Sequence, residues 1–119
     1  MMPTGLELLI GGLRDAQFGP SVSFGLGGVW VEALQDAVFG ILPMTRQELL
    51  KMIAETKAGA FIEGFRGSAP LDREAALSTI NAVSSLLTNH PEIVEIDLNP
   101  VRLYARSAVV LDARIVLRR

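Results

Sequence analysis

The stretch "EIDLNPVRLYARSAVVLDAR", from Glu95 to Arg114, places polar side chains inside an apolar strand pattern. The polar residues are Asp97, Asn99 and Asp112. The apolar residues around them, which predict a buried strand hairpin, are Val94, Ile96, Leu98, Val109, Val110 and Leu111. Burying a charge costs free energy unless a partner compensates it. The segment therefore raises the question of what these polar side chains bind.

Alternation along the first strand predicts which of its residues share a face, because successive side chains of an extended strand point to opposite sides. The inward residues are then Val94, Ile96 and Leu98, and the residues on the other face are Glu95, Asp97 and Asn99. Three polar side chains are thus expected together on one surface of the sheet.

The turn of the hairpin decides its register. A two-residue turn at residues 105–106 places Asn99 opposite Asp112 and Val101 opposite Val110. Opposed side chains lie about 4.5–5.5 Å apart at Cβ and point to the same face, so Asn99 and Asp112 could share one hard cation such as Mg²⁺. Ala-Arg is not a favoured two-residue turn, and a three-residue loop would offset the pair by one position. A solvent-facing polar surface explains the same alternation.

Composition narrows the class of protein. The 119 residues suit a single domain; half are hydrophobic and 20% are charged, a balance typical of globular proteins. A net charge of −2 gives no footprint for nucleic acid. The absence of cysteine excludes disulfides and thiolate sites. No apolar run is long enough to span a membrane, and the first residues lack a basic leader, so we expect a cytoplasmic protein with no membrane partner.

The rest of the chain predicts an α+β fold, with a mostly antiparallel sheet and two helices packed on one face. In the first strand Leu6, Leu8 and Ile10 share one face, and Glu7 and Leu9 the other. The expected strands are 6–13, 21–24, 29–34 and 37–42, followed after the helices by the closing hairpin. The expected helices are 46–57, which begins with a capping box of Thr45 and Glu48, and a second that starts near Asp72 and stops before Asn89.

Three runs of sequence, in this order, carry a resemblance to a known family: "GLELLIGGLRDAQFGPSVSFGLGGVWVEALQDAVFGILP", "GFRG" and "EIDLNP…LDAR". Together they resemble the second, C-terminal ATP-grasp subdomain of NDP-forming acyl-CoA synthetases, such as the β region of ADP-forming acetyl-CoA synthetase, which are related to the succinyl-CoA synthetase β subunit. The resemblance implies a ligase that converts a carboxylate, ATP and coenzyme A into acyl-CoA, ADP and phosphate. Acyl phosphate and phosphohistidine intermediates are implied with it.

The resemblance also implies roles for four residues. Asn99 and Asp112 match the asparagine and aspartate that hold Mg²⁺ in such proteins, and Asp97 matches an acid that contacts the phosphorylated histidine. Glu7 stands where ATP-grasp proteins carry a glutamate that binds the ribose hydroxyls of ATP or ADP. We expect Glu7 near the open edge of the sheet.

Other residues of the matching runs keep two interpretations. In "GLGG", the backbone of Gly25, Gly27 and Gly28 could form a nest for phosphate or phosphohistidine, or an ordinary tight turn. Arg66 of "GFRG" could contact a phosphate or pair with an acid.

The lone histidine and one arginine have simpler interpretations. His90 follows the second predicted helix, where a cap at the helix C-terminus is favoured over catalysis. Arg14 lies in a matching run and has a surface ion pair as its alternative role.

The resemblance implies that the chain, residues 1–119, is one subdomain whose partners lie elsewhere: the first ATP-grasp subdomain, and a coenzyme A-binding domain or subunit that carries the phosphohistidine. The isolated chain is then expected to be inactive, and a homo-oligomer is compatible with the resemblance. Two alternatives stay open, a subdomain of a ligase that joins a carboxylate to an amine, and a non-catalytic module that depends on a partner. The acyl substrate and nucleotide preference do not follow from the sequence.

Overall fold

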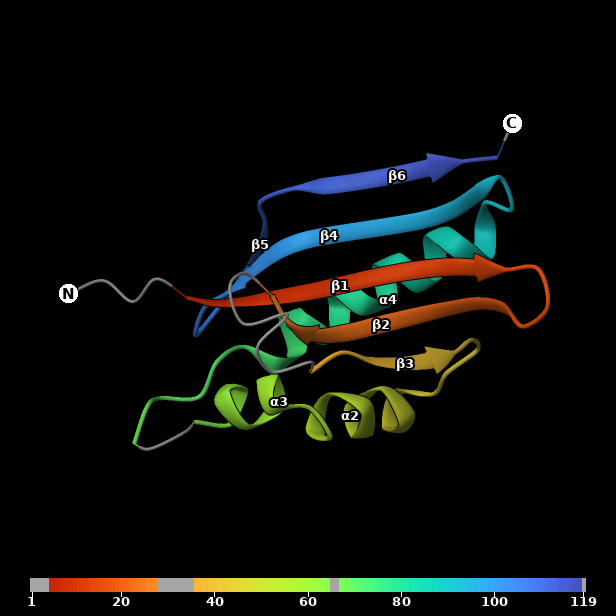
Figure 1. Cartoon of the computed structure of the whole chain (residues 1–119). Helices are drawn as coiled ribbons and strands as arrows, with labels where there is room; N and C mark the ends of the chain where they lie inside the picture. Colours follow the sequence, from red (N-terminus) through yellow and green to blue (C-terminus); the bar gives the residue numbers. More distant parts are fainter. Residues whose placement is uncertain (1–4, 28–35, 65–66, 119) are drawn as a thin grey trace.

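The computed structural model describes residues 5–27, 36–64 and 67–118, which form one antiparallel sheet with helices against one face (Figure 1). The strands are β1 (Leu6–Asp15), β2 (Gly19–Leu26), β3 (Val38–Ile41), β4 (Ile93–Leu103), β5 (Ala108–Val110) and β6 (Ala113–Leu117). The helices are α2 (Arg46–Ala54), α3 (Lys57–Ile62) and α4 (Arg73–Asn89). The predicted α+β class is confirmed, although the described residues form three helices where two were expected.

The sheet runs in the order β3-β2-β1-β4-β5, and β6 also pairs with β4. Every pairing is antiparallel. The central strand β1 joins the early hairpin to the closing one, so segments about 90 residues apart in the sequence lie side by side (Figure 1). The predicted strand 29–34 lies outside the described residues.

The face of the sheet that packs against the helices is set by alternation in β1 and β2. Leu8 and Ile10 of β1 and Phe24 of β2 are fully buried. On the same face, a Cβ on Gly12 would approach Leu87 of α4 to 2.6 Å, and a Cβ on Gly40 would approach the sulfur of Met52 of α2 to 3.3 Å. These glycines let the helices lie close to the sheet.

The first predicted helix is divided in two. The predicted capping box at Thr45 and Glu48 is present, but α2 ends at Ala54. Thr56 then caps a new helix, α3, by accepting a hydrogen bond from the backbone of Gly59. The prediction of one helix to Lys57 was wrong because the Thr56 side chain offers the backbone a new helix start, which apolar periodicity does not register. The predicted cap of α4 at Asp72 is confirmed.

The closing hairpin is less buried than its apolar sequence predicts. Ile96 is 2% exposed and faces the core, as expected, but Ile93 rather than Val94 is buried with it, because pairing with β6 is irregular between Ile93 and Glu95. Residues 109–111 are each 44–48% exposed. The predicted burial of residues 109–111 is wrong because β5 and the residue after it lie at the edge of the sheet. Within the described ranges, no helix has the length and apolar character to cross a membrane.

Candidate functional site

The face of the sheet away from the helices, called here the open face, carries a groove of about 460 Å³. Its floor comes from adjacent strands, because the alternate residues of β1, β2 and β4 point there. The lining residues are Leu9, Gly11, Gly12, Leu13, Ser21, Val22, Ser23, Phe39, Glu95, Ile96, Asp97 and Asn99. Small and polar side chains in the middle of the sheet thus leave room for a ligand.

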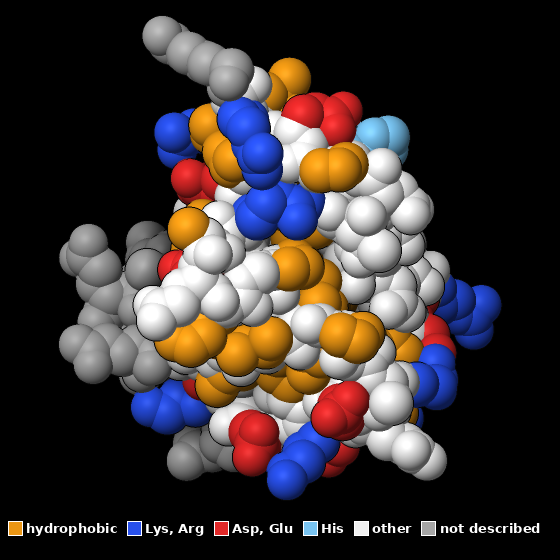
Figure 2. Space-filling view, turned by 90° about the vertical axis from the view of Figure 1, so that its right-hand side faces the viewer, with side chains coloured by type: hydrophobic (Ala, Val, Ile, Leu, Met, Phe, Trp, Pro, Cys, Tyr) orange, Lys and Arg blue, Asp and Glu red, His pale blue; other side chains and the backbone are white. Residues whose placement is uncertain are grey.

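Exposed apolar side chains flank one end of this groove. Register places Leu13 opposite Ser21, and Ser21 opposite Ile41, so the three lie in one row across β1, β2 and β3. Leu13 is 48% and Ile41 59% exposed. Figure 2 views this end of the molecule and shows hydrophobic side chains gathered in its middle, with basic groups beside them. The open face is therefore polar at Asp97 and apolar at this margin.

The predicted hairpin register is confirmed. Val101 pairs with Val110, and the Asn99 N–H donates a hydrogen bond of 3.1 Å to the Asp112 carbonyl. The Tyr104 N–H donates to the Ser107 carbonyl at 2.8 Å, which leaves residues 105–106 as a two-residue turn. Ala-Arg therefore forms the turn that its residue types disfavour, because the long pairing of β4 with its neighbours decides the register.

A bulge brings the asparagine to its place. Leu8 pairs with Val101 and Ile10 with Leu98, so Asn99 and Pro100 together lie opposite one residue of β1. An extra residue in one strand bends it and re-aims its side chains. Asn99 is thereby exposed and lines the groove, although the residues on both sides of the bulge keep their inward faces.

The proposed metal pair offers oxygen atoms but no closed cage. Asn99 and Asp112 are both exposed, and Asp112 lies beyond the lining of the groove. In the described part of the chain, no three acidic, histidine or cysteine side chains gather as a metal site. An amide and a carboxylate oxygen fit Mg²⁺, which commonly takes one or two protein ligands and completes its shell with water and phosphate.

Asp97 lies in the middle of the open face. Its register partners are Gly11 in β1 and Arg114 in β6, and it lines the groove beside Asn99. A Cβ on Gly11 would lie 2.9 Å from the Ser23 hydroxyl, so the glycine keeps the floor low next to the carboxylate. Asp97 is therefore available to a cationic or proton-donating group that enters the groove.

Glu7 occupies the central strand, so the prediction that it lies near an open edge of the sheet was wrong. It pairs in register with Arg102 of β4, and the Arg102 guanidinium donates a hydrogen bond of 3.0 Å to the Glu7 carboxylate. β4 returns from the far end of the chain to cover that side of β1, so Glu7 lies between two strands.

The glycine-rich run makes close backbone contacts. A Cβ on Gly25 would meet Ala37 Cα at 2.8 Å, and one on Gly27 would meet the backbone of Leu8 at the same distance. The Gly27 N–H donates to the Glu7 carbonyl at 2.9 Å. These two glycines allow chain segments to approach each other, and Gly28 and Arg66 lie outside the described residues.

Asp36 anchors the end of this run, a role that our sequence analysis missed. Its side chain accepts hydrogen bonds from the backbone N–H groups of Leu26 at 3.2 Å, Lys57 at 2.6 Å and Ala58 at 3.0 Å. The buried carboxylate thus joins the end of β2 to the start of α3. The sequence hinted at this role only by placing the acidic Asp36 in the apolar stretch before β3. The start of α3, whose backbone Asp36 binds, had not been predicted.

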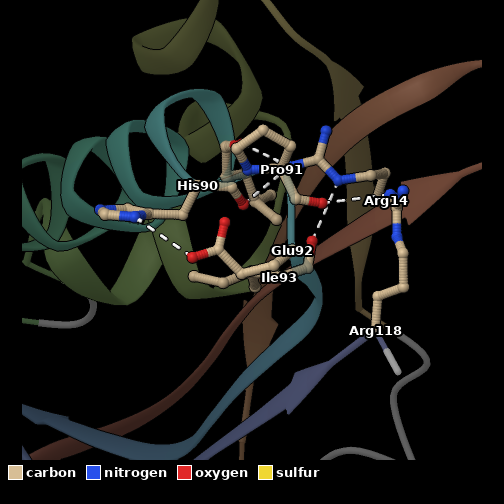
Figure 3. Close-up of polar contacts among 7 residues, drawn as sticks. Arg14, His90, Pro91, Glu92, Ile93 and Arg118 are labelled. Atoms are coloured by element: carbon tan, nitrogen blue, oxygen red, sulfur yellow. Dashed lines mark hydrogen bonds and ion pairs between the residues drawn. The ribbon is translucent and has the colours of Figure 1, made fainter.

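The α4–β4 connection accounts for His90 and Arg14 (Figure 3). His90 is the C-cap of α4, as predicted, and its ring lies 3.7 Å from the exposed Glu92 carboxylate. Arg14 donates hydrogen bonds to the carbonyls of Leu87, His90 and Ile93, so it stabilises the helix end instead of forming a surface ion pair. Arg118 similarly donates to the Pro91 carbonyl at 3.1 Å.

Comparison with known proteins identifies the family to which this chain belongs. The family model described as an ATP-grasp domain matches residues 1–117. The chain belongs to the ATP-grasp family. It is 46% identical over 117 residues to the β subunit of ADP-forming acetate–CoA ligase I from Pyrococcus furiosus, covering 98% of this chain and 50% of the relative. It is also 37% identical to the ADP-forming 4-hydroxybutyrate–CoA ligase of Nitrosopumilus maritimus, covering 98% of this chain and 17% of that protein.

A solved structure shares the ATP-grasp fold of this chain. Dinucleotide-forming acetyl-coenzyme A synthetase 1 from Ca. Korarchaeum cryptofilum, in complex with coenzyme A and Mg-AMPPCP, superposes with a TM-score of 0.90 at 47% identity. The match covers 99% of this chain and 55% of that one. The ATP-grasp segment described here therefore spans about half the length of that chain and of the Pyrococcus furiosus β subunit.

Proposed function

We propose that this chain is the second ATP-grasp subdomain of an ADP-forming acyl-CoA synthetase, in which it holds Mg-ATP or Mg-ADP on its open face. The observation that carries the proposal is the register of the closing hairpin, which brings Asn99 opposite Asp112 next to a groove lined by Asp97. The 46% identity to an ADP-forming acetate–CoA ligase subunit supports the reaction class.

Different residues of the open face would bind the metal ion, the phosphohistidine and the ribose. Asn99 and Asp112 would hold Mg²⁺, which when bound neutralises charge on the nucleotide phosphates. Asp97, beside them on the groove floor, would orient the histidine that accepts the phosphoryl group. Glu7, in the adjacent strand, would accept hydrogen bonds from the ribose hydroxyls. The described part of the glycine-rich run would contribute through the close backbone packing of Gly25 and Gly27, because the Gly27 N–H already donates to the Glu7 carbonyl.

The proposal requires partners that this segment does not provide within its described residues. Phosphoryl transfer needs the phosphates positioned and their charge neutralised from both sides, and the two lysines of the chain, Lys51 and Lys57, lie in the helical layer. A first ATP-grasp subdomain would supply the opposite wall, and a coenzyme A-binding domain or subunit would carry the phosphohistidine. The purified 119-residue chain should therefore form no acyl-CoA from ATP, Mg²⁺, acetate and coenzyme A. Acyl-CoA formation above background would contradict this division of labour.

Nucleotide binding by the purified chain tests the same division. A single wall offers a fraction of the contact area of a closed nucleotide site, so we expect ADP to bind with a dissociation constant on the order of millimolar, a weak affinity on the usual scale. Titration calorimetry measures it directly. Micromolar binding would mean that this segment alone contains the main nucleotide site.

The metal assignment is tested in a complete ligase that contains this segment. Asp112→Ala should abolish Mg-ATP-dependent turnover while the variant unfolds at the wild-type temperature, because Asp112 is exposed and its backbone bond to Asn99 is kept. Glu55→Ala is the matched control, since it removes an exposed carboxylate from the helical layer. Equal activity of the two variants would refute the assignment.

A further inference from the structure

Arg102 is the partner of Glu7, but the pair is more constrained than a surface ion pair. The two residues are directly opposed in β1 and β4, on the open face, one step along from Leu9 at the groove. The Arg102 Nη2 lies 3.0 Å from Glu7 Oε2, and each side chain is 33% exposed. The pair therefore borders the site proposed for the nucleotide.

Three contacts hold the arginine itself. Its pKa is raised, first by the hydrogen bond to Glu7 and then by a side-chain hydrogen bond with Tyr104. Its aliphatic part crosses the backbone of Gly5, where a Cβ would lie 2.6 Å from Arg102 Cγ and 2.9 Å from Tyr104 Cε1. Gly5 has a φ of +79°, a conformation that favours glycine. Glycine at position 5 therefore leaves room for the Arg102 side chain, and any residue with a Cβ at that position would clash with it.

The guanidinium is oriented for Glu7 at a cost to its own hydrogen bonding. Among the described residues, Arg102 Nε is a buried nitrogen without a hydrogen-bond partner. An unpaired buried donor costs free energy. The guanidinium is therefore held in an orientation in which Nη2 donates to Glu7 while Nε forms no hydrogen bond. The hydrogen bond from Arg102 engages Oε2 of Glu7 and fixes the direction of the carboxylate. Of the oxygens on this carboxylate, Oε1 takes no hydrogen bond from the described residues and stays open to a donor.

We propose that Arg102 is a positioning residue that holds the Glu7 carboxylate in the orientation that accepts hydrogen bonds from the ribose hydroxyls. The inference rests on the proposed function, in which Glu7 contacts the ribose. Arg102 itself need not touch the nucleotide. Its effect should then appear in how strongly the enzyme distinguishes a ribose from a sugar without hydroxyls, because the ribose hydroxyls are the groups that Glu7 is proposed to bind.

The test uses the complete ligase with ATP and with 2′,3′-dideoxy-ATP. Arg102→Leu should raise the KM for ATP about tenfold, the scale of one charge-assisted hydrogen bond, and leave kcat within about twofold, a ratio that reflects ground-state binding. The KM for dideoxy-ATP should stay unchanged. Arg102→Lys keeps the charge and the aliphatic stem, so it should recover part of the preference for ATP.

Two outcomes would overturn the inference. An equal rise in KM for both nucleotides, in Arg102→Leu and Arg102→Lys alike, would mean that Arg102 supports the fold rather than the orientation of Glu7. Unchanged preference for ATP in both variants would mean that Glu7 needs no positioning.

Glu7→Gln separates this failure from failure of the proposed function. If Glu7→Gln loses the preference for ATP and the Arg102 variants keep it, the positioning role alone is wrong. If Glu7→Gln also keeps the preference, the ribose contact in the proposed function is wrong.

Discussion

The two faces of the sheet are built from the same strands, but they contribute to different properties. On the helix-covered face Leu8, Ile10 and Phe24 are fully buried. On the open face the alternate positions of the same strands include Gly11 and Ser23, which leave a groove. Burial of apolar area drives folding, and alternation lets one face supply that burial. The other face is then free to carry residues that a core would reject.

The comparison explains why the polar residues of the closing hairpin do not destabilise the fold. Asp97 and Asn99 lie on the open face, whereas Ile96, between Glu95 and Asp97, is 2% exposed on the opposite side. A shift of one residue in register would exchange these faces. Pairing of β4 with β1 on one side and with β5 and β6 on the other prevents such a shift.

The largest contrast is expected between two phenylalanines. Phe24→Ala removes a fully buried ring from the helix-covered face and should lower the free energy of unfolding by about 3–5 kcal/mol. Phe39→Ala, at a position 73% exposed on the open face, should change it by less than about 1 kcal/mol. Urea denaturation of both variants measures the difference. Similar losses would mean that Phe39 is buried in solution.

Substitutions of two aspartates, one that anchors the fold and one at the candidate metal site, should likewise differ in their effect on stability. Asp36→Ala leaves three backbone N–H groups without their acceptor and should cost about 2–3 kcal/mol of unfolding free energy. Asp36→Asn should fall between this variant and the wild type. Asp112→Ala, at an exposed position, should stay within about 0.5 kcal/mol of the wild type. A neutral Asp36→Ala in thermal unfolding would contradict the anchoring role.

Gly11 and Gly12 are adjacent in β1 but lie on opposite faces of the sheet, so alanine substitutions at the two positions compare how tightly the faces are packed. A Cβ at Gly12 would crowd Leu87 and Val83 of α4, so Gly12→Ala should cost about 1–3 kcal/mol through overpacking. At Gly11 the nearest atom is the Ser23 hydroxyl, which can rotate, so Gly11→Ala should cost less. Chemical denaturation ranks the two. The reverse order would show that the open face is packed more tightly than the helical one.

The smallest effect concerns an exposed link within the helical layer. The hydrogen bond from Arg46 holds the pKa of Glu74 below its ordinary value. The contribution of this pair is therefore present above the ordinary pKa of glutamate and is lost as the pH falls through the lowered folded-state pKa. Wild type should lose slightly more stability than Glu74→Gln between pH 7 and pH 3. High salt should remove the difference, since both side chains are 58% exposed.

Much of the local structure follows from the sequence. The caps at Thr45 and Asp72 use side chains that bond to nearby backbone, so a few residues decide them. Alternation in β1 and β4 likewise separates Glu7 from Leu8, and Asp97 from Ile96. The sequence allowed two hairpin registers, because a three-residue loop would have offset Asn99 from Asp112 by one position. The structure has the register of the two-residue turn.

Other features depend on segments distant in sequence. The division of α2 from α3 involves Asp36, which lies about 20 residues before the α3 backbone that it binds. The central place of Glu7, and its pairing with Arg102, appear once β4 returns beside β1 from 95 residues away. The exposure of residues 109–111 depends on the edge position of β5 and the residue after it.

The sequence by itself therefore determined most strand faces and the helix caps at Thr45 and Asp72, because these depend on short-range backbone geometry. The pairing of Asn99 with Asp112 was one of two registers that the sequence allowed, and the pairing of β4 with its neighbours decided it. The order of strands decided which carboxylates meet which donors: Asp36 with the start of α3, and Glu7 with Arg102. Such contacts join residues whose approach depends on how the whole chain packs. Local periodicity carries no information on that approach, and only the tertiary structure decided it.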